Sequence, residues 1–188
     1  AIRQRSTVLG TWGFGKKMSL GKGIVALFHG PSGVGKTMTA EAIAGELGQP
    51  LYPVKLSAIM SKYVGETEKR LSAVFTAARE SASLLLFDEA DAFFRTRLDE
   101  GSSHAHYLNQ QVDVLLTELD KFDGISIMAT NRPETFDVAF ERRIRYRIEF
   151  GKPDFDARCA IWLKVVPEEA PVEPGMTFSD LARDFLFT

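Results

Sequence analysis

Eight consecutive residues with the types and spacing needed to bind phosphate stand at positions 30–37, where the chain reads Gly-Pro-Ser-Gly-Val-Gly-Lys-Thr. They match the pattern G-x-x-x-x-G-K-[ST] at every fixed position. Glycines in such a loop let backbone N–H groups turn inward around phosphate oxygens, and the following helix N-terminus adds positive potential. Lys36 is expected to reach the β- and γ-phosphates, and the Thr37 hydroxyl to hold Mg²⁺. The residues expected to contact the nucleotide are Ser32, Gly33, Val34, Gly35, Lys36, Thr37 and Met38.

Two consecutive carboxylates, Asp88 and Glu89, follow an apolar run at residues 84–87. Because ligands of parallel sheets collect at the carboxyl ends of the strands, Asp88 is expected to bind Mg²⁺ through water. Glu89 can then take a proton from an attacking water, so the pair predicts nucleotide hydrolysis. Kinases that act on small molecules usually lack the second carboxylate, and the guanine-reading pattern N-K-x-D of GTPases is absent from the sequence.

A third polar position is Asn131, which directly follows a predicted strand and Thr130. An amide at the carboxyl end of that strand could contact both the γ-phosphate and the attacking water. Asn is also common at the start of turns, and Arg132 and Pro133 come next. The local pattern leaves both interpretations open.

Strands that alternate with helices must position these residues. Apolar runs at residues 24–28 and 84–87 are typical of strands buried on both faces. A run with a proline, at residues 51–56, predicts a strand at the edge of the sheet. Asp88 follows Lys36 at a separation of 52 residues, which leaves room for a strand inserted between the two catalytic strands. We therefore expect an α/β P-loop fold of the additional-strand type, with a parallel sheet between helices.

The chain is expected to divide into three parts. Residues 1–23 are predicted to form a polar N-terminal strap, residues 24–150 the P-loop core, and residues 151–188 part of a small helical domain. In the last part, apolar residues predict one helix around residues 155–163 and a second over residues 178–185.

Composition and charge narrow the functional classes. A net charge of −2 over 188 residues gives no bulk basic field to attract nucleic acid. The longest apolar runs are far too short to span a bilayer, and no secretory signal is visible. A single cysteine, Cys159, excludes an internal disulfide and is typical of a reducing compartment, so we expect a cytoplasmic protein.

Four motifs resemble those of the AAA ATPase family in order and spacing, namely residues 30–37, 84–91, 129–133 and 136–144. Residues 61–66, Ser-Lys-Tyr-Val-Gly-Glu, are similar to the pore loop of that family. The resemblance covers roughly Trp12 to Phe185 and looks closest to stand-alone bacterial AAA proteins. After Pro31 the phosphate loop reads Ser-Gly-Val where the commonest family form has Pro-Gly-Thr, at positions that vary.

The resemblance implies roles for residues that local patterns alone leave undecided. Asn131 would be the sensor that positions the attacking water. Arg142 and Arg143 would be arginine fingers that reach the γ-phosphate bound by a neighbouring subunit. The alternative is that they form a solvated basic face together with Arg145 and Arg147.

The resemblance also implies sites outside the hydrolytic centre. Tyr63 and Val64 would line a central pore and grip a protein substrate. Gly13 lies where the family packs its N-terminal strap on adenine, although plain core packing of this loop is an equal alternative. Residues 151–188 would begin the helical lid, and the chain stops before the glycine-rich helix that completes it.

Together, these implied roles describe an ATP-driven motor protein. The cofactors would be ATP and Mg²⁺, and the assembly a homo-oligomeric ring, a hexamer, that remodels, unfolds or disassembles a protein partner. The alternative is a nucleotide-gated assembly switch or scaffold that moves no substrate. A nucleic-acid motor is disfavoured by the net charge and by an aromatic rather than basic residue at pore position 63.

Overall fold

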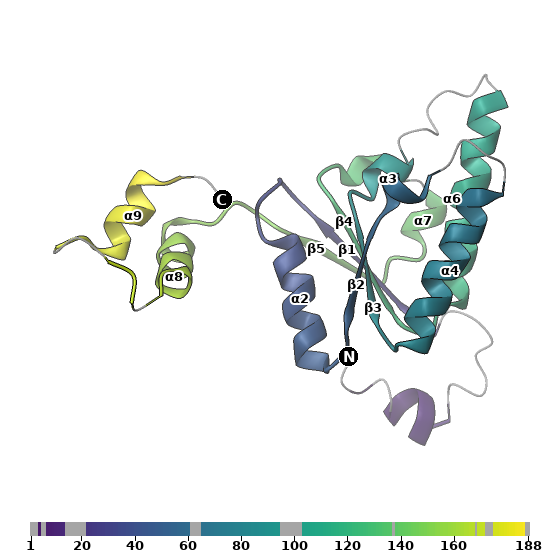
Figure 1. Cartoon of the computed structure of the whole chain (residues 1–188), viewed down its shortest axis with the longest axis horizontal. Coiled ribbons are helices and arrows are strands. Elements are labelled where there is room, and N and C mark those ends of the chain that lie inside the picture. Colours follow the sequence, from purple (N-terminus) through teal and green to yellow (C-terminus); the bar gives the residue numbers. More distant parts are fainter. Residues whose placement is uncertain are drawn as a thin grey trace.

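The computed structural model of the chain describes residues 4, 7–13, 22–60, 65–94, 103–136, 138–167, 169–171 and 175–186, with only the backbone described at residues 92 and 103–108. Its centre is a five-stranded sheet in which every neighbouring pair is parallel (Figure 1). The strand order is β2-β3-β4-β1-β5. The strands are β1 (Ile24–His29), β2 (Leu51–Lys55), β3 (Leu84–Asp88), β4 (Ile125–Thr130) and β5 (Tyr146–Glu149). The predicted α/β P-loop fold with a parallel sheet is confirmed.

Helices cover both faces of this sheet (Figure 1). Helix α2 (Lys36–Leu47) packs on one face, and α4 (Glu66–Glu80) and α6 (Ser103–Lys121) pack on the other. Shorter elements lie between them and at the N-terminal end of the chain: η2 (Thr7–Thr11), α3 (Leu56–Ile59), α5 (Asp91–Phe94), η4 (Pro133–Thr135) and α7 (Val138–Glu141). A buried apolar core fills each side, because the three central strands are apolar on both faces.

The strand order explains which sequence predictions hold. The proline-containing strand β2 lies at the sheet edge, as predicted, and ends at Lys55 because α3 begins with the next residue. The strand inserted between β1 and β3 is β4, which follows the acidic pair in sequence and does not come from the interval between the two motifs. The strand β5 was not predicted: all four of its residues are exposed, so it lacks the apolar run of a buried strand.

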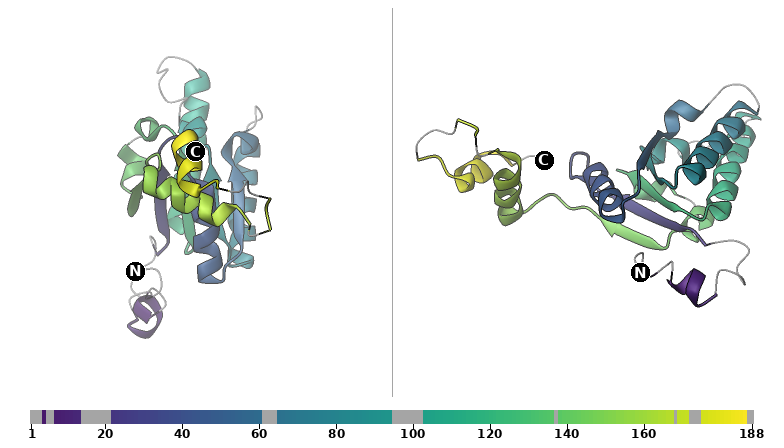
Figure 2. Two further views of the ribbon diagram at one scale, coloured as in Figure 1. Left: turned by 90° about the vertical axis from the view of Figure 1, so that its left-hand side faces the viewer. Right: turned by 60° about the horizontal axis from the view of Figure 1, so that its bottom comes forward.

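The last described elements, α8 (Phe155–Val165) and α9 (Phe178–Asp184), pack against each other and stand apart from the sheet (Figures 1 and 2). The rings of Trp162 and Phe185 lie 5.8 Å apart, and the Arg158 Nε donates to the Ala182 carbonyl oxygen at 2.9 Å. Both predicted helices are therefore present. Among the described residues, no helix is long and apolar enough to cross a membrane.

Two glycines give a matched test of this architecture. Gly30 has a φ of +145°, and a Cβ at this position would collide with the carbonyl oxygen of Phe150. Gly45 lies within α2 with open space around the position of a Cβ. We expect Gly30→Ala to lower the melting temperature strongly. Gly45→Ala should raise the free energy of unfolding by about 0.5–1 kcal/mol, because alanine loses less backbone entropy in a helix. Thermal unfolding of both variants checks this, and equal effects would contradict the packing at Gly30.

Candidate functional site

Three strands end at one edge of the sheet and bring their polar residues together there. In the pairing of β1 with β4, His29 lies opposite Thr130, and in the pairing of β3 with β4, Phe87 lies opposite Met128. Backbone bonds continue past the strand ends, since the Gly30 N–H donates to the Thr130 carbonyl oxygen at 3.2 Å. The phosphate loop, the acidic pair and Asn131 therefore share the carboxyl edge of the sheet, where ligands of parallel sheets bind.

The backbone of the phosphate loop is shaped for an anion. Gly33 and Gly35 have φ values of +81° and +92°, a region that glycine adopts without a steric penalty. Gly35 is the N-cap of α2, and no side chain caps the helix there. The first N–H groups of α2, at Lys36, Thr37 and Met38, lack intrahelical acceptors by helix geometry. They are available to phosphate oxygens, and the helix dipole favours the negative charge.

Lys36 is buried at the centre of this edge, with 8% of its surface exposed. Its Nζ donates to the carbonyl oxygens of Gly30 at 2.8 Å and Pro31 at 2.6 Å, and to the Asn131 Oδ1 at 2.8 Å. Burial lowers the pKa of Lys36, while the carboxylates of Asp88 and Asp91 act in the opposite direction. The ammonium thus has an acceptor for each of its three protons, and two carboxylates favour its charged form.

The acidic pair turns sharply at the end of β3. The Glu89 N–H donates to the Asp88 Oδ1 at 2.9 Å, and Glu89 has a φ of +53°. A left-handed conformation is unfavourable for a residue other than glycine and is often found at functional sites. Glu89 is exposed while Asp88 is half-buried. The turn therefore separates a partly covered carboxylate from one that solvent reaches.

Magnesium fits the oxygen groups available at this edge. Mg²⁺ usually keeps several waters and takes one or two protein oxygens plus substrate phosphates, rather than a complete protein cage. The Thr37 hydroxyl is exposed at the start of α2, and the half-buried Asp88 lies at the end of β3. The described residues contain no cluster of three or more His, Cys, Asp or Glu side chains that could hold a metal ion.

The two arginines assigned jointly by the resemblance differ in their contacts. Arg143 forms a two-pronged ion pair with Asp120, at 2.9 Å from Nε and 2.7 Å from Nη2, and its Nη1 donates to the Ala139 carbonyl oxygen at 2.7 Å. Arg142 is exposed, and within the described ranges it has neither an ion pair nor a side-chain hydrogen bond. Of the four arginines considered for a basic face, Arg147 is also paired, with Glu141 at 2.8 Å.

An aromatic cluster holds the turn that carries these arginines. The rings of Phe94, Phe136 and Phe140 lie 4.6–4.8 Å from one another. Phe94 belongs to α5, which follows the acidic pair, and Phe140 belongs to α7, which precedes Arg142. The position of the arginine turn is thus fixed relative to the end of β3 through buried rings.

The structure does not test every predicted site residue. Tyr63 and Val64 lie outside the described residues, so their place in a pore loop stays a prediction. Gly13 is described, with a φ of +74° and open space around the position of a Cβ, and its contact with adenine stays a prediction. Sequence reasoning missed Asp91 and Asp120, whose partners are distant in sequence.

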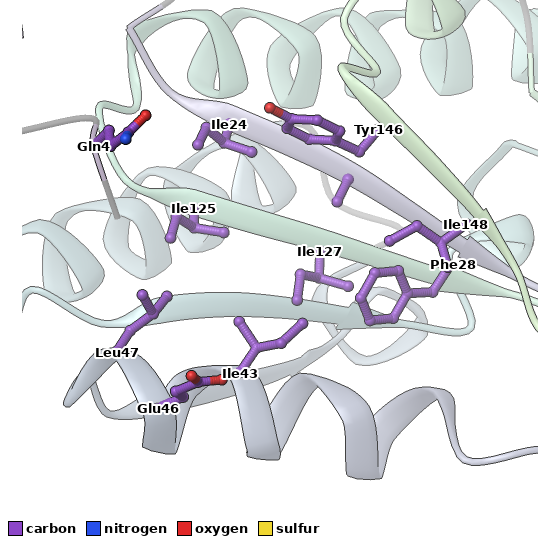
Figure 3. Close-up of a pocket in the computed structure, with 11 residues that line it drawn as sticks. Gln4, Ile24, Phe28, Ile43, Glu46, Leu47, Ile125, Ile127, Tyr146 and Ile148 are labelled. Atoms are coloured by element: carbon purple, nitrogen blue, oxygen red, sulfur yellow. The ribbon is translucent and has the colours of Figure 1, made fainter. Parts of the chain in front are cut away.

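A large apolar groove lies away from the catalytic edge. It has a volume of about 590 Å³ and runs between the second half of α2 and the face of the sheet (Figure 3). Its lining is Gln4, Ile24, Ala26, Phe28, Ile43, Glu46, Leu47, Ile125, Ile127, Tyr146 and Ile148. Among the described residues of this lining, Glu46 is the one carboxylate, and none is a predicted phosphate or metal contact. The groove is therefore not the nucleotide site.

Comparisons with known proteins cover the part of the chain that holds this site. The sequence model of the ATPase family associated with various cellular activities (AAA) matches residues 26–152. The chain is 40% identical, over 78% of its length and 44% of the relative's, to the uncharacterized AAA family ATPase y4kL of Sinorhizobium fredii. It is 39% identical, over 83% of its length and 33% of the relative's, to the ATP-dependent zinc metalloprotease FtsH 3 of Sphaerobacter thermophilus. It is 36% identical, over 86% of its length and 36% of the relative's, to the 26S proteasome regulatory subunit 7 homolog of Saccharomyces cerevisiae. The chain thus spans a third to just under half of these relatives.

The separation of phosphate cradle and acidic pair predicts two different defects. Lys36→Ala should abolish nucleotide binding, because it removes the cation in the phosphate loop. Glu89→Gln should bind normally and lose turnover by about 10²–10⁴, the usual contribution of general-base catalysis. Nucleotide affinity and phosphate release, measured on both variants, check this. Wild-type turnover in Glu89→Gln would remove Glu89 from the mechanism.

Proposed function

We propose that this chain, which belongs to the AAA family of ATPases, is the motor core of a homo-oligomeric, hexameric ring that remodels, unfolds or disassembles a protein partner. ATP hydrolysis is the chemistry of the family, and the residues for it meet at one edge of the sheet. The observation that carries the proposal of a ring is Arg142, an exposed cation on a turn toward the amino ends of the strands, where the Arg145 N–H donates to the Val25 carbonyl oxygen at 2.8 Å. Such a cation is available to a neighbouring subunit.

Each residue at this edge would have its own role in ATP hydrolysis. Lys36 and the first N–H groups of α2 bind and orient the β- and γ-phosphates. Glu89 accepts a proton from the water that attacks the γ-phosphate, and the Asn131 amide orients that water. Thr37, and Asp88 through water, would hold Mg²⁺, which would supply positive charge beside the phosphate oxygens.

The contacts of Arg142 and Arg143 support different roles for these two arginines. Charge on the transferring phosphoryl group can be stabilised by an arginine that another protein chain supplies. Arg143 is engaged by Asp120 and the Ala139 carbonyl, whereas the Arg142 guanidinium is exposed. We therefore assign the contact with the neighbouring nucleotide to Arg142. Arg143 is instead directed back to α6 by its ion pair with Asp120.

A protein substrate is supported by the relatives and by the predicted pore loop. Two similar proteins are named as an ATP-dependent metalloprotease and as a regulatory subunit of the proteasome, and both names concern protein turnover. Tyr63 and Val64, between α3 and α4 in sequence, would grip an extended polypeptide. An aromatic ring can pack on any chain without reading its sequence.

The assignment of Arg142 predicts activity that is shared between subunits. Arg142→Ala should bind ATP normally and lose turnover by up to about 10³–10⁵, the contribution of arginine fingers in GTPases. Lys36→Ala subunits cannot bind ATP but still carry Arg142. Mixing the two inactive variants should restore part of the turnover. Steady-state ATPase assays over a range of protein concentrations and mixing ratios measure this.

Arg145→Ala is the matched control, because Arg145 is an exposed arginine three residues further on. It should keep wild-type turnover, whereas a loss equal to that of Arg142→Ala would favour a general basic face. If mixing restores no turnover and specific activity does not depend on protein concentration, Arg142 does not act on the nucleotide of a neighbouring subunit.

The pore-loop assignment predicts a defect in work on protein. Tyr63→Ala should abolish stimulation of ATP turnover by an unfolded model protein without lowering the melting temperature, whereas Tyr63→Phe should keep the stimulation. If Tyr63 were instead a core residue, its truncation would cost about 3–5 kcal/mol of stability. A strongly destabilised Tyr63→Ala variant, or one that is stimulated normally, would overturn the assignment.

A further inference from the structure

Thr130, the last residue of β4, connects three parts of the catalytic edge. Its hydroxyl donates to the Asp91 Oδ1 at 3.0 Å and accepts from the Arg132 N–H at 2.9 Å. Its carbonyl oxygen accepts from the N–H of Gly30 at 3.2 Å. One residue therefore contacts the phosphate loop, the helix after the acidic pair, and the backbone that follows Asn131.

Chemistry fixes the direction of both hydroxyl bonds. An ionised carboxylate only accepts, and a backbone amide only donates, so the Thr130 hydroxyl donates to Asp91 and accepts from Arg132. Both side chains are buried, with 2% of Thr130 and 7% of Asp91 exposed. A buried hydroxyl with both partners satisfied resists rotation, because any other orientation leaves a buried polar group unpaired.

These bonds restrain Asn131, which lies in sequence between Thr130 and Arg132, the two residues joined by the second bond. The backbone on one side of Asn131 belongs to the end of β4, and on the other side it is held by the Arg132 bond. The side chain is held as well, since its Oδ1 accepts from Lys36. Asn131 is thus held in place by its protein neighbours on both sides and through its side chain.

We propose that Thr130, held by Asp91, is a positioning residue for hydrolysis: its hydroxyl sets the place of the Asn131 amide relative to the phosphate loop and Glu89. The inference rests on the proposed role of Asn131 in orienting the attacking water. Thr130 does not touch the nucleotide in this account. Its contribution is to geometry, and a displacement of about 1 Å in a catalytic group can reduce a rate by about 100-fold.

The test compares Thr130→Val, which keeps the shape and removes the hydroxyl, with Thr130→Ser, which keeps the hydroxyl. Turnover, KM for ATP, ATP affinity and melting temperature are measured on the whole chain at one protein concentration. Thr130→Val should reduce kcat by about 10–100-fold and leave ATP affinity within a few-fold of wild type. Thr130→Ser should restore most of kcat. If Thr130→Val is too unstable, Thr130→Ala replaces it, because the smaller side chain leaves space for a water beside Asp91.

A double-mutant cycle with Asn131→Ala separates positioning from a structural role. Since Thr130 is proposed to act through Asn131, Thr130→Val should cause no further loss of kcat in the Asn131→Ala background. Independent losses in the two variants would overturn the inference, as would normal kcat in Thr130→Val beside an impaired Asn131→Ala. Wild-type kcat in Asn131→Ala would instead contradict the proposed role of Asn131 itself, and the inference would fail with it.

Discussion

The insertion of β4 between β1 and β3 is the constraint on which the catalytic edge depends. Neighbouring strands lie about 4.8 Å apart, so two intervals separate the phosphate-loop strand from the strand that ends in Asp88 by about 10 Å. That space accommodates phosphate oxygens, a hydrated cation and an attacking water. Direct pairing of β1 with β3 would close it. The inserted strand also delivers Asn131 to the middle of the gap, because parallel strands end at the same side.

Polar groups at this edge stabilise one another. Lys36 is buried, and a buried ammonium without acceptors would be costly. It is paired with two loop carbonyls and Asn131, while Thr130 pairs with Asp91. A preorganised polar site needs little rearrangement when charge develops in the transition state, which is a main source of catalytic rate. The left-handed, strained backbone at Glu89 is a further feature of a preorganised site.

The arginine turn is held chiefly by apolar packing. The ion pair between Arg143 and Asp120 is partly exposed, and such pairs contribute about 0–1 kcal/mol. Burial of an aromatic side chain such as Phe140, which is fully buried against Phe94 and Phe136, contributes about 1.5–3 kcal/mol. The rings therefore hold the turn in place, and the ion pair directs one arginine back to α6. Non-directional packing thus sets the position of the turn, and the directional salt bridge sets the orientation of the Arg143 side chain.

The sequence by itself determined the phosphate loop, the acidic pair and the buried strands, because each depends on consecutive residues whose types and period are visible locally. It did not reveal β5, whose exposed residues mix apolar and charged types at the sheet edge. Only the tertiary structure decided that Arg143 binds Asp120 and that Thr130 binds Asp91, 23 and 39 residues away. Such pairings depend on the order of strands and on which helix covers which face. Local periodicity carries no information about that order, because it reports the burial of a segment and not the identity of its neighbour.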